Sequence, residues 1–469
     1  MENKKLSSAK ALSLFIISIA IIFIGVLWVK APVTIVLVAA AAVTITFAAI
    51  WGVKWDDIMK DLTENLSTMF PAILLLLSVG MLVGSWILSG TVPILIYYGL
   101  KILSPSIFLV AACLICAIMS VIAGTSWGTM GTVGVALMGV SAGLGIPAPY
   151  AAGAVLTGAI FGDKLSPLSD TTVFASAVSD VYILDHIKHM LFTTIPGFII
   201  SLILYGVLGA KYSAGSIASD QMNQIFSALQ NSFNLNPVLL LPPVIILFLI
   251  YKKKPILPVF AVGIVLGGLL AIIFQGATIL DVANTLNSGF SKATGAEIVD
   301  KMLKRGGLTS MLGTTAIVIG SAVYGSPLKT AGVIDVILDK IQEVAKSVRT
   351  IMFSGYLLHL VLFTITGAYY ITFTIVGSML KPVFDKYNIK RTNLSRLLED
   401  TGTAYAPLVP WSVFAVFTAG TLGVPTLEYA LYAPITYMGI ILAVIYISTG
   451  FSITMTKPAK PEASKDVTM

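Results

Sequence analysis

The sequence predicts an all-α protein that crosses a membrane many times and is built from two inverted repeats. Three observations lead to this fold class. The 469 residues are 57% hydrophobic and only 11% charged, whereas soluble domains are about 25% charged. Several apolar stretches approach or reach the roughly 20 residues that a helix needs to cross a bilayer. Four patterns of the first half recur in the second half, in the same order and at nearly the same offset.

The apolar stretches give the expected order of the membrane elements. Each half begins with two leading helices, expected at 12–29 and 33–51 and again at 237–250 and 256–274. An amphipathic connector follows in each half, then a core of broken helices and a closing helix. This order predicts roughly eleven to fourteen membrane elements, all of them helical because lipid offers an exposed backbone no hydrogen bonds. The two connectors are expected at 53–65 and 277–306.

The repeats are visible in paired sequence motifs. The segment AGTSWGTMGTVG corresponds to TGAYYITFTIVG, and GDKLSPLSDTT corresponds to LEDTGTAYAPLVPWS, each with an acid shortly before Pro-Leu. The third pair begins with Leu-Ser-Thr-Met in one half and Leu-Thr-Ser-Met in the other. The fourth correspondence is that between the leading helices. The paired motifs lie at 123–134 and 366–377, at 162–172 and 398–412, and at 66–92 and 308–333.

Basic residues predict how the halves are oriented. Lys4, Lys5 and Lys10 place the amino terminus in the cytoplasm, because lysine-rich segments tend to stay on that side. The lysine turn at 252–254 is expected there too, although it follows the first helix of its half. The corresponding turn at 30–32 follows one crossing and is therefore expected outside. The halves are thus inverted, as in many secondary transporters.

We therefore expect four parts along the chain. The net charge of +7 is concentrated in the connecting segments, which indicates contact with lipid headgroups rather than with nucleic acid. Cys113 and Cys116 lie in an apolar run and are interpreted as packing residues, because a redox pair needs an accessible thiolate. The expected parts are a first repeat at 1–210, an external linker at 211–236, a second repeat at 237–452 and a cytoplasmic tail at 453–469.

Two acids lie at corresponding places in the repeats. Asp163 and Asp400 each follow an apolar helix, and Pro167 and Pro407 prevent that helix from continuing. An ionised side chain at bilayer depth costs at least about 2.5 kcal/mol, so such acids indicate a function. We expect both to bind the transported cation.

Hydroxyl groups near these acids supply neutral oxygen ligands. Hard cations such as sodium prefer oxygen, and a carboxylate beside hydroxyls and free carbonyls offers that set. A buried carboxylate also takes up a proton more readily. A site that holds either a proton or a sodium ion is a minimal exchanger. The other predicted cation ligands are Ser126, Thr125, Thr129, Ser166, Ser169, Asp170, Thr171, Thr172, Glu399, Thr401 and Thr403.

Some roles stay open at this level. Glu399 either binds the cation or is neutralised by a neighbouring arginine, and Lys164 is expected to pair with Asp163 when the site is empty. His359 either relays protons or is a hydrogen-bonded structural residue. The histidines within 185–189 have helical metal spacing but an incomplete ligand set, so no metal site is expected there.

The motifs GTSWGT, IPAPYAAGAVLTGAIFGDKLSPLSDTT and SRLLEDTGTAYAPLVPW resemble the NhaC-type sodium/proton antiporter family of bacteria. The resemblance extends from the second helix to beyond Trp411. It implies a multi-pass secondary antiporter of the bacterial inner membrane with both termini in the cytoplasm. By wider analogy with the ion-transporter superfamily, it also implies an elevator-type homodimer with a scaffold and a moving transport domain.

The predicted function is therefore exchange of Na+ for H+ by alternating access, without a cofactor. The resembling family also includes exchangers that couple sodium and protons to malate and lactate. For that alternative, the candidate carboxylate ligands are Lys164, Lys329, Ser126 and Tyr370. A passive channel and an intramembrane enzyme are more distant alternatives, and the sequence has no HExxH, nucleophile elbow, phosphate loop or dinucleotide fingerprint.

Overall fold

The computed structural model describes residues 7–212, 219–333, 336 and 347–456. Over these residues the chain is helical, and its one β-type pairing is an isolated bridge between Ile389 and Met455. Eight helices are long and apolar enough to cross a membrane, or up to eleven if each bent helix pair is one crossing. The predicted all-α membrane fold is confirmed. Lys4, Lys5, much of the predicted tail and part of the predicted linker lie outside the described residues.

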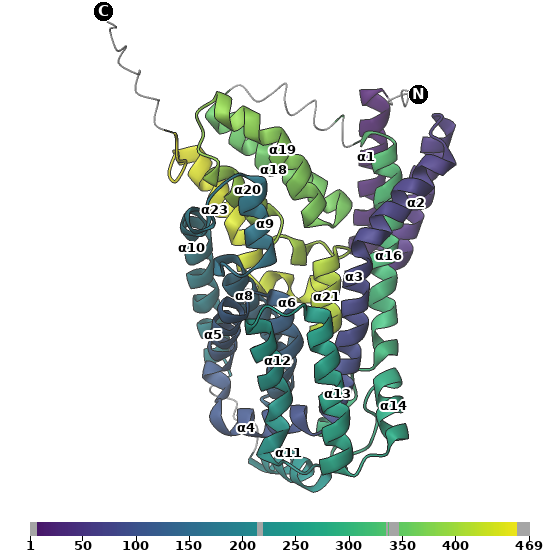
Figure 1. Cartoon of the computed structure of the whole chain (residues 1–469), viewed down its shortest axis with the longest axis vertical. Coiled ribbons are helices and arrows are strands. Elements are labelled where there is room, and N and C mark those ends of the chain that lie inside the picture. The colour runs from purple at the N-terminus through teal and green to yellow at the C-terminus, as the bar shows by residue number, and fades with distance from the viewer. Residues whose placement is uncertain (1–6, 213–218, 334–335, 337–346, 457–469) are drawn as a thin grey trace, which may run out of the picture.

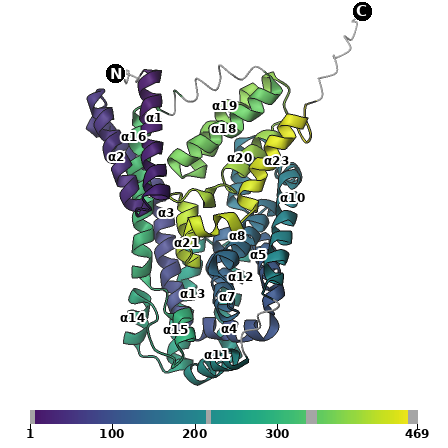
Figure 2. The same cartoon turned by 180° about the vertical axis from the view of Figure 1, so that it is seen from behind.

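The helices pack as two groups, each with members from both halves of the chain. We call the first group the frame. The frame consists of α1 (Ser8–Phe23), α2 (Val33–Ile50), α3 (Trp55–Leu88), α4 (Thr91–Ile102), α12 (Leu241–Tyr251), α13 (Ile256–Gln275), α14 (Ile279–Ser288), α15 (Glu297–Leu303) and α16 (Leu312–Thr330). Helices α1, α2, α3, α14 and α16 stand on the right in Figure 1 and on the left in Figure 2, whereas α4 and α12 extend under the second group.

The second group carries the acids that the sequence singled out, and we call it the site bundle. Its members are α5 (Pro105–Ala123), α6 (Ser126–Thr129), η2 (Met130–Gly134), α7 (Val135–Gly143), α8 (Ala148–Leu165), α9 (Asp170–Val178), α10 (Ile183–Ala210), α18 (Val348–Thr366), α19 (Tyr369–Lys386), α20 (Thr392–Thr401), α21 (Val413–Leu422), α22 (Thr426–Tyr429) and α23 (Ile435–Thr449). The amphipathic helix α11 (Ser219–Ser232) lies at the end of the molecule opposite the start of α1 (Figures 1 and 2).

Helix α3 forms the spine of the frame and contacts α13, α14 and α16. It runs for 34 residues without a break, through Pro71. The predicted connector at 53–65 is therefore not a separate element but the beginning of this helix. The predicted connector at 277–306 does contain separate short helices, α14 and α15, divided by a loop with Gly289 and Gly295 in left-handed conformations.

A glycine contact fixes the loop after α15 to the spine. The Gly307 amide donates a hydrogen bond to the Gly80 carbonyl of α3 at 2.6 Å. A Cβ atom on Gly80 would lie 2.4 Å from the Gly307 carbonyl oxygen, so no larger residue fits without movement. Gly306 and Gly307 both have positive φ angles, +85° and +82°, which favour glycine. The loop is therefore held rigidly on α3.

A second glycine contact positions the helix that carries the first acid. α8 packs closely on α5, and a Cβ atom on Gly158 would lie 2.1 Å from the Cys113 carbonyl oxygen. Cys113 and Cys116 are fully buried free cysteines in this contact, in agreement with their predicted packing role. Small residues let membrane helices approach closely. This contact brings the last turn of α8, with Asp163, against α5.

Two helix breaks occur at corresponding places in the halves. α5 ends at Gly124 and α18 ends at Gly367, both in the left-handed conformation with φ of 67° and 63°. The next residues, Thr125 and Ala368, are extended and precede α6 and α19. Interrupted helices of this kind leave backbone groups free at their ends. The broken helices that the sequence predicts for the core of each half are therefore present, with interruptions at Gly124 and Gly367.

We expect Gly158→Ala to lower the unfolding free energy by about 1–3 kcal/mol, because the added methyl group forces α8 away from α5. The matched control is Gly206→Ala in α10, where nothing lies within 4 Å of the added Cβ atom; it should stabilise the helix by about 0.5–1 kcal/mol. Thermal unfolding of the detergent-purified variants measures both. Equal melting temperatures for the two variants would contradict the close α5–α8 contact.

Candidate functional site

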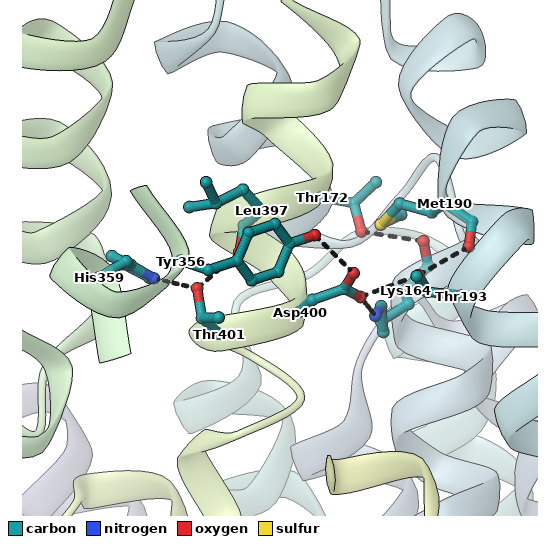
Figure 3. A network of polar contacts seen from close by, with 9 residues as sticks. All are labelled: Lys164, Thr172, Met190, Thr193, Tyr356, His359, Leu397, Asp400 and Thr401. Atoms are coloured by element: carbon teal, nitrogen blue, oxygen red, sulfur yellow. Dashed lines mark hydrogen bonds and ion pairs between the residues drawn. The ribbon is translucent and has the colours of Figure 1, made fainter. Parts of the chain in front are cut away.

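A buried ion pair joins the two halves of the chain at the centre of the site bundle. The Lys164 ammonium on α8 lies 2.7 Å from Oδ1 of Asp400 on α20, and the side chains are 1% and 0% exposed. Oδ1 also accepts a hydrogen bond from Thr193 at 3.0 Å, and Oδ2 accepts one from the Tyr356 hydroxyl at 3.3 Å (Figure 3). Asp400 is therefore neutralised and hydrogen-bonded at both oxygens.

This arrangement differs from the predicted pairing of Lys164 with Asp163. The two residues are neighbours at the end of α8, but the lysine side chain reaches across to the other half of the chain instead. The sequence motif placed Lys164 and Asp163 together, whereas the contact with Asp400 depends on how α8 and α20 meet. Asp163 is consequently left without a cationic partner among the described residues.

Asp163 is 2% exposed and has one hydrogen-bonded and one free oxygen. Its Oδ2 accepts a hydrogen bond from the Ser126 hydroxyl at 2.6 Å, and its Oδ1 has no partner within the described chain. Ser126 is the first residue of α6, directly after the break at Gly124 and Thr125. The acid and this helix break thus meet in space, as expected if Asp163 and Ser126 bind the same cation.

Glu399 is the second buried acid without a neutralising partner. It is fully buried, and neither of its carboxylate oxygens has a hydrogen-bond partner among the residues that the structure describes. The same holds for the Thr403 hydroxyl one turn further on. Glu399 lies within electrostatic range of Asp163, Lys164 and Asp400. Because buried polar groups are nearly always paired, these free oxygens mark a place that a ligand can occupy.

The arginines near Glu399 in the sequence do not form an ion pair with it in the described structure. Arg391 binds Asp180 at 2.8 Å and Asp385 at 2.6 Å at the molecular surface. Its hydrogen bonds lower the pKa of the Asp385 carboxyl. Arg396 is buried and hydrogen-bonds the Ser452 hydroxyl. The alternative in which an arginine neutralises Glu399 is therefore not seen.

Most of the predicted hydroxyl ligands already hydrogen-bond protein groups. Thr172 donates to the Asp163 carbonyl at 3.2 Å, which ties α9 to the end of α8. Ser169 caps α9. The remaining predicted hydroxyls bond as follows: Thr125 with Gly128, Thr129 with Thr125, Ser166 with Val121, Thr171 with Ser169, and Thr401 with Leu397 and His359. Since a hydroxyl oxygen has two lone pairs, these groups can still offer an oxygen to a cation.

A cavity of about 460 Å³ opens beside the break between α5 and α6. One wall is the turn between α12 and α13, and the others come from α3, the α8–α9 connection and the first residue of α19. The charged and polar side chains that line it are Thr125, Asp170, Lys253, Lys254 and Tyr369. Lys253 and Lys254 were not singled out as ligands by the sequence analysis, because only the packing of the turn places them here.

The other predicted carboxylate ligands lie elsewhere. Lys329 is on the frame, where it pairs with Asp61 at 2.8 Å and is 51% exposed. Tyr370 hydrogen-bonds Asp170 at the start of α9, next to the cavity. Lys164 is occupied by Asp400. The basic groups that line the cavity are therefore Lys253 and Lys254 of the lysine turn, and not Lys164 or Lys329.

The histidines have hydrogen-bonded, structural positions. Both ring nitrogens of His359 contact threonine hydroxyls, at 2.6 Å from Thr401 and 2.9 Å from Thr372, so the structural alternative fits this residue. His186 bonds Ser395 at 2.8 Å and His189 bonds Thr454. Over the described ranges, no group of three or more His, Cys, Asp or Glu residues is placed to hold a metal.

Comparison with known proteins identifies the family that this chain resembles over most of its length. A model of the Na+/H+ antiporter family matches residues 2–179 and 158–451. The chain is 39% identical to the malate-2H+/Na+-lactate antiporter of Bacillus subtilis, covering 88% of each chain. It is 35% identical to the Na+/H+ antiporter NhaC of Alkalihalophilus pseudofirmus, covering 95% of this chain and 96% of that one. The arginine/ornithine antiporter ArcD of Halobacterium salinarum is 37% identical over 89% of this chain and 86% of its own.

We expect Lys164→Gln and Asp400→Asn each to cost about 3–5 kcal/mol, because each leaves a buried charge without its partner. The double variant Lys164→Gln/Asp400→Asn should recover much of this loss, since both charges are then absent. Thermal unfolding of the four proteins gives the double-mutant cycle. Additive losses would show that the two side chains do not interact.

Proposed function

Because this chain belongs to the Na+/H+ antiporter family, we propose that it exchanges Na+ for H+ across the bacterial inner membrane by alternating access. The observation that supports this most directly is the presence of two buried carboxylates, Asp163 and Glu399, whose charges no described cationic side chain neutralises. Asp400, the third acid, already has Lys164. An uncompensated carboxylate at this depth is expensive, so each acid favours a bound cation.

The exchange follows from this charge requirement. A proton or a sodium ion on Asp163 and Glu399 reduces the negative charge, and the two ions compete for the same oxygens. The free Oδ1 of Asp163, the oxygens of Glu399 and the hydroxyls of Ser126 and Thr403 are the proposed sodium ligands. Release of one ion permits binding of the other from the same side, and a change of access then carries it across.

Inverted repeats provide the proposed basis for alternating access. The left-handed glycines Gly124 and Gly367 interrupt helices at corresponding positions of the two halves. The α1–α2 hairpin lies at one end of the molecule and the α12–α13 hairpin lies toward the other (Figure 1). These features support the proposed parts 1–210 and 237–452 as inverted halves. The proposal also includes cytoplasmic termini and a homodimer, which rest on the sequence analysis alone.

We expect Asp163→Asn and Glu399→Gln each to reduce sodium-driven proton movement by about a hundredfold, because loss of a charged ligand costs several kcal/mol. Proteoliposomes with an internal pH dye measure this after sodium is added outside. Asp185→Asn, at an exposed acid at the start of α10, is the control and should keep its activity. Ordinary exchange by both site variants would rule out this assignment.

The lined cavity supports a second candidate, exchange of small organic acids coupled to sodium and protons. Lys253 and Lys254 face the cavity, and α9, α13 and α19 begin at its walls. Helix amino termini carry partial positive charge and favour anions. A relative of this chain is named as a malate-2H+/Na+-lactate antiporter. A carboxylate held by this cavity would lie next to the proposed cation site.

The two proposed functions differ in whether sodium moves protons when no organic acid is present. We expect sodium to move protons in proteoliposomes that contain no organic acid; a flux that requires malate and lactate on opposite sides would establish the second candidate. In that case Lys253→Gln and Lys254→Gln should each raise the KM for malate by about tenfold, the effect of one charged hydrogen bond. Lys252→Gln changes the same turn outside the cavity lining and should leave that KM unchanged.

A further inference from the structure

The frame and the site bundle meet through apolar surfaces. α3 and α16 pack against α21, and α4 and α15 pack against α7. The bundle presents glycines there: Gly131 faces the Phe260 ring and Gly139 faces Ile96, each with space too small for an unshifted Cβ atom. Small residues facing apolar side chains form no hydrogen bonds that would hold two surfaces in one register. These contacts are therefore held mainly by close apolar packing.

One hydrogen bond crosses this apolar contact. Nη2 of Arg305 in the frame donates to the carbonyl of Leu422 in the site bundle at 3.3 Å. Between described residues, no other hydrogen bond or ion pair joins the frame to the site bundle. The remaining ones lie within one group or involve the segment that links the halves. Arg305 also has no acidic side chain within ion-pair distance in the described chain.

Both ends of this hydrogen bond are firmly placed. Leu422 is the last residue of α21, and the helix ends at Gly423 with φ of 73°. Carbonyls at a helix end lack internal partners and carry partial negative charge, so they favour a cation. On the frame side, the Arg305 carbonyl accepts a hydrogen bond from Phe290 at 3.2 Å. The next residues, 306–307, are the glycines held on α3.

We propose that Arg305 is a positioning residue that stabilises the arrangement described here, in which the cavity beside α6 is open. The inference rests on the proposed alternating access, because only a movement of the bundle along the frame breaks this hydrogen bond. Arg305 belongs to the frame and Leu422 to the bundle, so their separation changes when the groups shift. Arg305 thus biases the equilibrium between the two access states and touches neither the proposed ligands nor the cavity.

A cysteine in the cavity wall reports the open state. Ala72 on α3 lines the cavity and is partly exposed, so Ala72→Cys in a background with Cys113→Ala and Cys116→Ala provides one reactive thiol. We expect Arg305→Ala to slow its labelling by a hydrophilic thiol reagent by about three- to tenfold, the effect of one charged hydrogen bond at a helix end. Arg305→Lys retains the charge and should give an intermediate rate.

Lys304→Ala is the matched control, because Lys304 is the adjacent exposed cation and pairs with Asp300 on its own helix; its labelling rate should equal that of the parent. The sodium KM and the maximal exchange rate of Arg305→Ala should change together, whereas misfolding would lower the rate alone. The inference is overturned if Arg305→Ala labels at the rate of the parent, or if Arg305→Ala and Lys304→Ala change the labelling rate equally. If the parent labels but does not exchange sodium for protons, the proposed function fails and the labelling comparison still decides the role of Arg305.

Discussion

The ion pair between Lys164 and Asp400 is the interaction on which the site depends. It joins α8 of the first half to α20 of the second in a part of the molecule that excludes water. A lysine buried without an anion would lose its charge or destabilise the fold, so the two helices must meet at this point. Their meeting places Glu399 and Asp163 in the same electrostatic environment. The pair thus neutralises Asp400, whereas Asp163 and Glu399 keep carboxylate oxygens without a partner among the described residues.

The sequence allowed the helical membrane fold, the broken helices of the core and the burial of Asp163 to be predicted, because each depends on local composition. Glycine followed by extended residues interrupts a helix wherever it occurs, and apolar runs of sufficient length form helices in lipid. The partner of Lys164 could not be predicted in this way. Its nearest acid along the chain is Asp163. In the structure α8 and α20 both pack against α9 and α10, and this arrangement brings Asp400 within 2.7 Å of the Lys164 ammonium.

The same limitation explains the other differences. In the sequence, Lys253 and Lys254 indicated only which side of the membrane their turn faces. The structure shows that this turn also forms one wall of the cavity. No sequence motif distinguished Tyr356 or Thr193, yet both hydrogen-bond Asp400 in the structure. Helix α3 was expected to have a separate connector before it, because its first turns are polar; the structure continues the helix through them. Pairings between distant segments account for the first two cases, whereas the third is a continuous helix of neighbouring residues.

The lysine turn at the cavity also has a kinetic consequence for ion capture. Lys253 and Lys254 line the cavity together with one acid, Asp170, and the positive potential of this excess charge repels a cation that enters the cavity. Added electrolyte screens such a potential over about 10 Å at 0.1 M ionic strength. The association rate of sodium therefore rises when an inert salt is added, whereas an anion approaching the same entrance is slowed. For sodium that enters through this cavity, capture is therefore expected to be fastest in a medium of high ionic strength.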